Sequence, residues 1–114
     1  LILVSFITNW CGYCRKMDRT TWKDAEVVRS LGDLVTVRVD AEEGLERDGF
    51  SGRELADRHQ VYGYPTLLML DADGREIART GGYQEPAQLL SWLERSLAGA
   101  GRPAPSGAVP VTAR

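Results

Sequence analysis

Cys11 and Cys14 are the only two cysteines among the 114 residues, and Gly12 and Tyr13 separate them. They follow an apolar run over residues 1–7, and residues 11–19 are typical of a helix with a basic outer face. Residues i and i+3 at a helix start lie on one face, so the two sulfur atoms can form a disulfide. The helix N-terminus favours a Cys11 thiolate, which predicts Cys11 as the nucleophile and a more buried Cys14 as the resolving thiol.

Three other uses of the cysteines compete with thiol–disulfide exchange: a structural disulfide, a zinc site, and a metal or cluster site shared between chains, which is the least expected of the three. A purely structural disulfide is disfavoured because so short a loop restricts the unfolded chain little. Zinc needs four ligands, and beyond the two thiols the sequence offers one histidine, His59, which we expect to be solvated at a helix end. We therefore expect no metal and no cofactor other than a redox-active Cys11–Cys14 disulfide.

The elements that must position the cysteines follow from the hydrophobic pattern. Residues 1–7 are apolar on both alternating faces apart from Ser5, which predicts a central strand. A second helix is expected over 24–31, with Asp24 as N-cap and an apolar stripe of Val27, Val28 and Leu31. The remaining predictions are strands at 34–39, 66–70 and 75–79, a tight turn at 71–74, and helices at 51–60 and 87–97.

This order, β-α-β-α-β-β-α, predicts an α/β domain over residues 1–98 with a mixed sheet and helices on both faces. The last helix is expected to bury Trp92 and a leucine stripe. Residues 71–74 (Asp-Ala-Asp-Gly) resemble the start of a calcium loop but lack the later ligands, so we interpret them as a hairpin turn. Residues 99–114 are rich in Gly, Pro, Ala and Ser and predict a flexible tail.

The charge balance restricts the partners. Fourteen Lys and Arg against 16 Asp and Glu give a formal net charge of −2, which provides no positive field for nucleic acid or anionic lipid. No apolar run approaches the ~20 residues that cross a bilayer. We expect no nucleic-acid partner and no membrane contact by this segment.

The motif Trp10-Cys11-Gly12-Tyr13-Cys14, with Tyr64-Pro65-Thr66 at a strand head and Gly82 downstream, resembles the thioredoxin superfamily over about residues 1–98. Residues 14–17 (Cys-Arg-Lys-Met), 21–24 (Thr-Trp-Lys-Asp) and Val27 are similar to the electron-receiving thioredoxin-like domains of the bacterial periplasm, of the DsbD C-terminal type. The resemblance implies a thioredoxin-like fold in a minimal form, because the family's N-terminal strand and helix have no counterpart in this sequence.

The resemblance also implies a substrate surface. Pro65 matches the family's cis-proline, which would place the Tyr64 backbone beside the cysteines for strand-like pairing with a substrate; a trans turn proline is the alternative. Trp10 is expected to cover the disulfide, or else to pack in the core, and Tyr13 to be exposed. The expected substrate-binding residues are Trp10, Gly12, Tyr13, Tyr64, Pro65 and Gly82.

Two positions depart from the family pattern. Ser5 occupies the place of the buried aspartate that lies six residues before the first cysteine in typical thioredoxins, and Thr36 occupies that of the accompanying lysine. A neutral Ser5 cannot act as a strong base, so the proton acceptor for Cys14 is not the usual one.

The sequence therefore predicts a thiol:disulfide oxidoreductase that works as a reductase on protein thiols and disulfides together with a redox partner protein. A disulfide oxidase or isomerase is an alternative, since Gly-Tyr between the cysteines is similar to periplasmic isomerases, and a non-catalytic thioredoxin-like binding module is another. We expect a monomer in the periplasm or another extracytoplasmic compartment, with the cytoplasm as the alternative.

Overall fold

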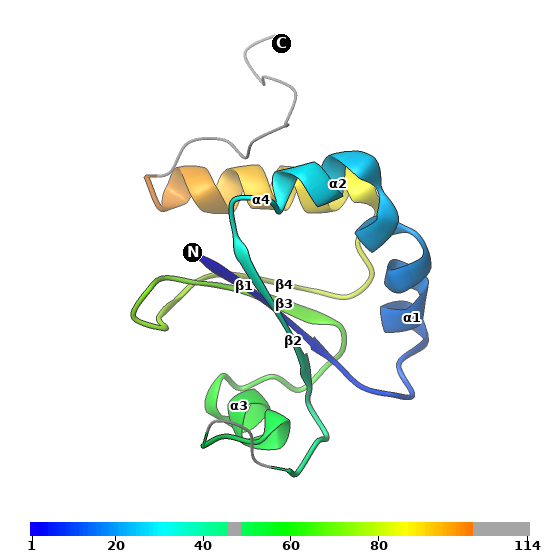
Figure 1. The fold of residues 1–114 in the computed structure, drawn as a ribbon, viewed down its shortest axis with the longest axis vertical. Coiled ribbons are helices and arrows are strands. Elements are labelled where there is room, and N and C mark those ends of the chain that lie inside the picture. Colours follow the sequence, from blue (N-terminus) through cyan, green and yellow to red (C-terminus); the bar gives the residue numbers. More distant parts are fainter. Residues whose placement is uncertain (46–48, 102–114) are drawn as a thin grey trace, which may run out of the picture.

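The computed structural model describes residues 1–45 and 49–101, which form one mixed sheet with helices on both faces (Figure 1). The strands are β1 (Ile2–Ile7), β2 (Val35–Asp40), β3 (Thr66–Leu70) and β4 (Glu76–Gly81). The helices are α1 (Gly12–Arg19), a 3₁₀ turn (Thr21–Lys23), α2 (Ala25–Ser30), α3 (Gly52–Arg58) and α4 (Pro86–Gly99).

The strands lie in the order β2-β1-β3-β4. β1 runs parallel to β2 and antiparallel to β3, and β3 and β4 form the antiparallel hairpin predicted around residues 71–74. The Asp71 carboxylate accepts hydrogen bonds from the N–H groups of Asp73 and Arg75, which closes the hairpin turn. β1 is central as predicted, so the cysteines directly after it emerge from the middle of the sheet.

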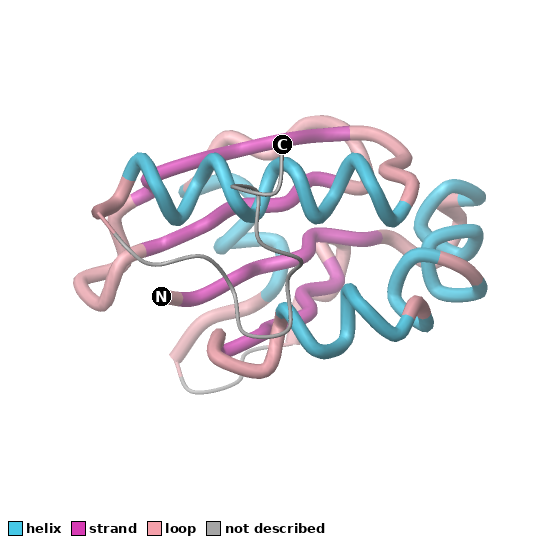
Figure 2. Tube along the Cα trace, turned by 90° about the horizontal axis from the view of Figure 1, so that it is seen from above, coloured by secondary structure: helices cyan, strands magenta, loops and turns pink. Residues whose placement is uncertain are grey.

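Two apolar clusters cover the two faces of the sheet. α3 covers one face, where the buried residues are Val4, Phe6, Val39, Ala41, Ala56, Val61, Leu68 and Leu70. α2 and α4 cover the other, where the buried residues are Leu3, Val27, Leu67, Met69, Leu89, Trp92 and Leu93. Figure 2 views the molecule from the α4 side and shows α1 beyond the end of the strands, where it begins at the cysteine pair.

Several expectations need correction. Val28 does not belong to the apolar stripe of α2, because it is 55% exposed. The helix predicted over 51–60 ends at Arg58, since Gln60 has a left-handed φ of 55° that cannot continue a helix. The 3₁₀ turn was not predicted: Thr21 is fully buried and donates a hydrogen bond to the Gln84 carbonyl, a tertiary contact that local pattern does not contain.

The α/β thioredoxin-like fold with a mixed sheet is confirmed. α4 extends through Gly99, one residue into the segment predicted as a tail, and residues 102–114 of that segment lie outside the described residues. Within the described ranges, none of the helices combines the length and apolar character needed to cross a membrane.

Candidate active site

Cys11 and Cys14 form a disulfide at the start of α1, with their Cα atoms 5.3 Å apart. Cys11 is the N-cap and Cys14 lies in the first turn of the helix. Both residues are buried, with 4% and 2% exposed, so Cys14 is only slightly more buried than Cys11 in the oxidised state. The pair lies at a helix start after a central strand, as the sequence predicts.

The helix start stabilises negative charge on Cys11. The Cys14 N–H donates to Cys11 Sγ at 3.1 Å, so the sulfur satisfies one of the free N–H groups at the N-terminus of α1. The first turn of α1 contains no acidic residue. After reduction, the same N–H and the positive end of the helix dipole would favour the Cys11 thiolate over the thiol.

The segment around Pro65 is the second part of the site. The Tyr64–Pro65 peptide bond is cis, and Pro65 is buried at the head of β3. Its carbonyl accepts a hydrogen bond from the N–H of Gly82, which has a φ of +82° that glycine adopts without strain. Neither the N–H nor the C=O of Tyr64 is paired within residues 1–45 and 49–101, so both can pair with an extended peptide.

Trp10 links the cysteine segment to the Pro65 segment. Its ring contacts Tyr64 edge to face, with centroids 5.9 Å apart, and its Nε1–H donates to a Glu42 carboxylate oxygen at 2.9 Å. Because 62% of Trp10 is exposed, the core-packing alternative is wrong, and the indole lies at the rim of the candidate site next to Cys11. Glu42 is a site residue that sequence reasoning missed.

Tyr64 completes this rim as a neutral phenol. Burial, with smaller contributions from the carboxylates of Glu42 and Asp57, raises the pKa of Tyr64 above its ordinary value. The hydroxyl therefore remains a hydrogen-bond donor throughout the pH range in which thiolates react.

Tyr13 is 60% exposed, as predicted, and lies between the two cysteines in the sequence. Its ring approaches Tyr83, with centroids 6.2 Å apart, and the Lys16 ammonium lies 4.3 Å from the centroid of Tyr83. Gly12 is exposed, and a methyl group added there would meet no atom within 4 Å, so a partner can approach the backbone between the cysteines. Tyr83 follows Gly82 in the chain and was not predicted as a site residue.

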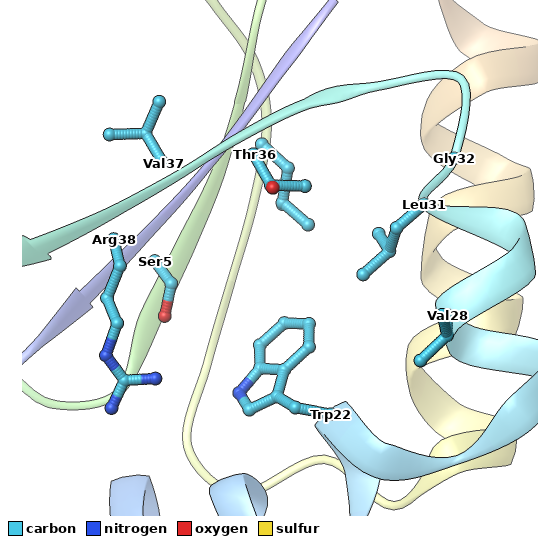
Figure 3. Close-up of a pocket in the computed structure, with 9 residues that line it drawn as sticks. Ser5, Trp22, Val28, Leu31, Gly32, Thr36, Val37 and Arg38 are labelled. Atoms are coloured by element: carbon cyan, nitrogen blue, oxygen red, sulfur yellow. The ribbon is translucent and has the colours of Figure 1, made fainter.

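Ser5 is buried, with 9% exposed, and its hydroxyl has no hydrogen-bond partner in the part of the chain that the structure describes. It lines a pocket of about 400 Å³ together with Thr36, Arg38 and Trp22 (Figure 3). In the strand register Ser5 is opposite Arg38, whose guanidinium forms two hydrogen bonds to the Asp18 carboxylate. Among the described residues, those that line this pocket include no carboxylate.

His59 is at a helix end as predicted, but it is half-buried rather than solvated. It is the C-cap of α3, and its ring lies 6.3 Å from that of Phe6. No group of three or more His, Cys, Asp and Glu residues in the described ranges is arranged to hold a metal ion.

The comparisons with known proteins agree with this geometry. The model of a thioredoxin-like domain family matches residues 1–97. The chain belongs to this family. A thiol:disulfide interchange protein DsbD from Ralstonia nicotianae is 31% identical over 97 residues, which cover 84% of this chain and 15% of the relative. The chain thus spans about a sixth or less of the length of such relatives.

Solved structures share the same fold. The oxidoreductase DsbH superposes with a TM-score of 0.72 and 27% identity, covering 85% of this chain and 72% of the other. The oxidised C-terminal domain of Neisseria meningitidis DsbD superposes with a TM-score of 0.66, covering 83% and 78% of the two chains; at 18% identity it supports the fold alone. This thioredoxin-like domain thus carries a Cys11–Cys14 pair that can form a disulfide, within a family of thiol:disulfide oxidoreductases.

Proposed function

We propose that the domain is a reductase that transfers electrons to protein disulfides through Cys11 and Cys14. The observation that carries the proposal is the 3.1 Å hydrogen bond from the Cys14 N–H to Cys11 Sγ at the start of α1. Because the helix start stabilises Cys11 Sγ as a thiolate, Cys11 is the residue that attacks the partner disulfide.

The exchange proceeds in two balanced steps. The Cys11 thiolate attacks one sulfur of a partner disulfide, so that a mixed disulfide forms and the other partner sulfur leaves as a thiolate. Cys14 then loses its proton and attacks Cys11 Sγ, which releases the first partner sulfur as a second thiolate. The partner gains two electrons, this domain is left with the Cys11–Cys14 disulfide, and a dithiol redox partner reduces it again.

We propose that Cys14 loses its proton without a buried carboxylate as acceptor, since none of the buried residues in the described ranges is acidic. Ser5 is neutral, and its pocket is lined by no carboxylate. The departing partner thiolate or water therefore accepts the proton, which makes the second step faster as the pH rises toward the pKa of Cys14.

The partner segment binds in an extended conformation. The free N–H and C=O of Tyr64 beside Pro65 pair with its backbone, and Trp10, Gly12, Tyr13 and Gly82 surround its cysteine. We place this activity in the periplasm or another extracytoplasmic compartment, because the curated relatives are interchange proteins of the DsbD type.

The test is a trapping experiment with a disulfide-containing protein substrate. Cys14→Ser should accumulate mixed disulfides on non-reducing gels, because nothing resolves them, while Cys11→Ser should accumulate far fewer. Equal trapping by both variants would overturn the assignment of roles. A protein that fails to reduce insulin with dithiothreitol as electron donor would instead be a binding module.

The direction of electron transfer is tested separately by measuring the reduction potential of the Cys11–Cys14 pair in glutathione buffers. A potential well below that of the glutathione pool supports a reductase. A potential near that of disulfide isomerases would favour the oxidase or isomerase alternative.

A further inference from the structure

One stripe of α1 contacts a single tyrosine of the β4–α4 loop. Tyr13, Lys16 and Thr20 follow each other at helical spacing, and all three contact Tyr83: the ring of Tyr13, the ammonium of Lys16, and the hydroxyl of Thr20 at 3.3 Å from the phenol oxygen. Tyr83 therefore holds the exposed Tyr13, the residue between the two cysteines, from the side of α1.

The backbone around Tyr83 is held in place on both sides. Gly82 donates its N–H to the Pro65 carbonyl at 2.9 Å, and the Gln84 carbonyl accepts a hydrogen bond from the buried Thr21 hydroxyl at 2.5 Å. The backbone on both sides of Tyr83 is thus anchored to the Pro65 segment and to Thr21, and the ring lies against α1.

Three basic side chains are exposed on α1, and one of them lies over this ring. Lys16 is the one over the ring, and Arg19 lies one turn further along the helix. The guanidinium of Arg15 donates to the Asn9 carbonyl at 3.3 Å, next to Trp10 in the chain. The one acidic residue of α1, Asp18, is held by the guanidinium of Arg38 at 2.6 and 2.7 Å. At the residue before Cys11, the Trp10 indole donates a hydrogen bond to the Glu42 carboxylate. A cation thus lies at the Tyr13–Tyr83 ring pair, and a carboxylate lies at Trp10.

We propose that the Tyr13–Tyr83 ring pair, with the cations of α1, forms a docking surface for protein segments that carry Asp or Glu within a few residues of their reactive cysteine. The inference rests on the proposed thiol–disulfide exchange and names the substrate class for the same site. The Glu42 carboxylate at Trp10 disfavours acidic side chains there, so the segment binds with its acidic side chains toward Lys16. Tyr83 acts as a positioning residue, since it holds Tyr13 and Lys16 at the rim.

The test uses three peptides, each with one cysteine in a mixed disulfide with thionitrobenzoate, that differ only in flanking Asp, Asn or Lys residues. The release of thionitrobenzoate by the reduced protein gives a second-order rate constant, which is divided by the rate constant of dithiothreitol with the same peptide. This ratio removes the effect of the flanking charges on the peptide's own reactivity. We expect the Asp peptide to exceed the Lys peptide by about threefold to tenfold at low salt, the range for a few exposed charge pairs, and to lose this advantage in about 0.5 M salt.

Three variants make the result specific. Lys16→Glu should reduce the preference for the Asp peptide at least threefold. Arg75→Glu is the control and should preserve the preference, because Arg75 lies in the β3–β4 turn, at the far end of the sheet from α1 (Figure 1). Tyr83→Ala should weaken the preference and Tyr83→Phe, which keeps the ring, should retain it. A Lys16→Glu protein with the wild-type preference, or a wild type without any preference, overturns the proposal. If reaction with all three peptides, the neutral one included, is absent, the proposed exchange activity itself has failed.

Discussion

Replacing Gly52 by alanine should destabilise the domain, although alanine is a better helix former than glycine. Gly52 is the first residue of α3, and a Cβ built there would lie 3.0 Å from the Asp40 carbonyl carbon and 3.3 Å from Val39 Cγ1, with the Asp40 carbonyl oxygen closer still. Two of these three atoms are backbone at the end of β2, so no side-chain rotation relieves the contact. The start of α3 or the end of β2 must move.

The magnitude follows from the cost of overpacking. Forced backbone shifts in a packed region cost roughly 1–3 kcal/mol and sometimes more, against a gain of under about 1 kcal/mol from the Gly-to-Ala helix preference. We expect Gly52→Ala to lower the free energy of unfolding by about 2 kcal/mol. With a urea m-value of about 1.5 kcal/mol/M, the midpoint falls by more than about 1 M.

The assay is urea unfolding of the oxidised protein followed by circular dichroism, with Gly99→Ala as the matched control. Gly99 ends α4 in open space, with nothing within 4 Å of an added methyl group, so the same substitution there should leave the midpoint unchanged or raise it slightly. The Asp40 carboxylate also accepts the Glu42 N–H, and Glu42 holds Trp10, so Gly52→Ala should change the tryptophan emission as well. A midpoint for Gly52→Ala equal to or above that of the wild type would refute the packing argument.

Three further outcomes are expected. Asp24 caps α2 by accepting from two N–H groups, so Asp24→Ala should cost about 1 kcal/mol and Asp24→Asn much less, as measured by urea midpoints. The hydrogen bond from Arg79 lowers the pKa of Glu76. This carboxylate therefore stabilises the fold above its unfolded pKa, and the contribution is lost as the pH falls through its folded pKa. The difference in the free energy of unfolding between wild type and Glu76→Gln should be constant near neutrality and shrink in acid. In Ser5→Asp, burial should raise the pKa of the introduced carboxyl, so this variant should be less stable at pH 7 than in mild acid. The negative charge should also raise the pKa of the Cys11 thiol, measured by thiolate absorbance against pH. An unchanged pKa of this thiol would mean that Ser5 is too far from the cysteines to act on them.

Most helices and strands could be predicted from the sequence because their signals are local. Asp24 and Ser51 cap helices through N–H groups two or three residues away, and the residue 71–74 turn closes on its own aspartate. The errors lie where tertiary contacts override local pattern. Val28 matches the helical apolar spacing of α2, yet it faces solvent, since the sheet packs against Val27 on the same helix.

The sequence by itself determined the cysteine pair, its place at a helix start after a central strand, and the proline at the head of β3, because each depends on neighbours along the chain. Only the tertiary structure decided what surrounds the pair. Glu42 is 32 residues from the indole that it binds, and Tyr83 is 63 residues from Thr20. Such contacts depend on strand order and on how α1 lies beyond the end of the sheet, which no local spacing encodes, and they set the charge and the aromatic rim that a partner meets.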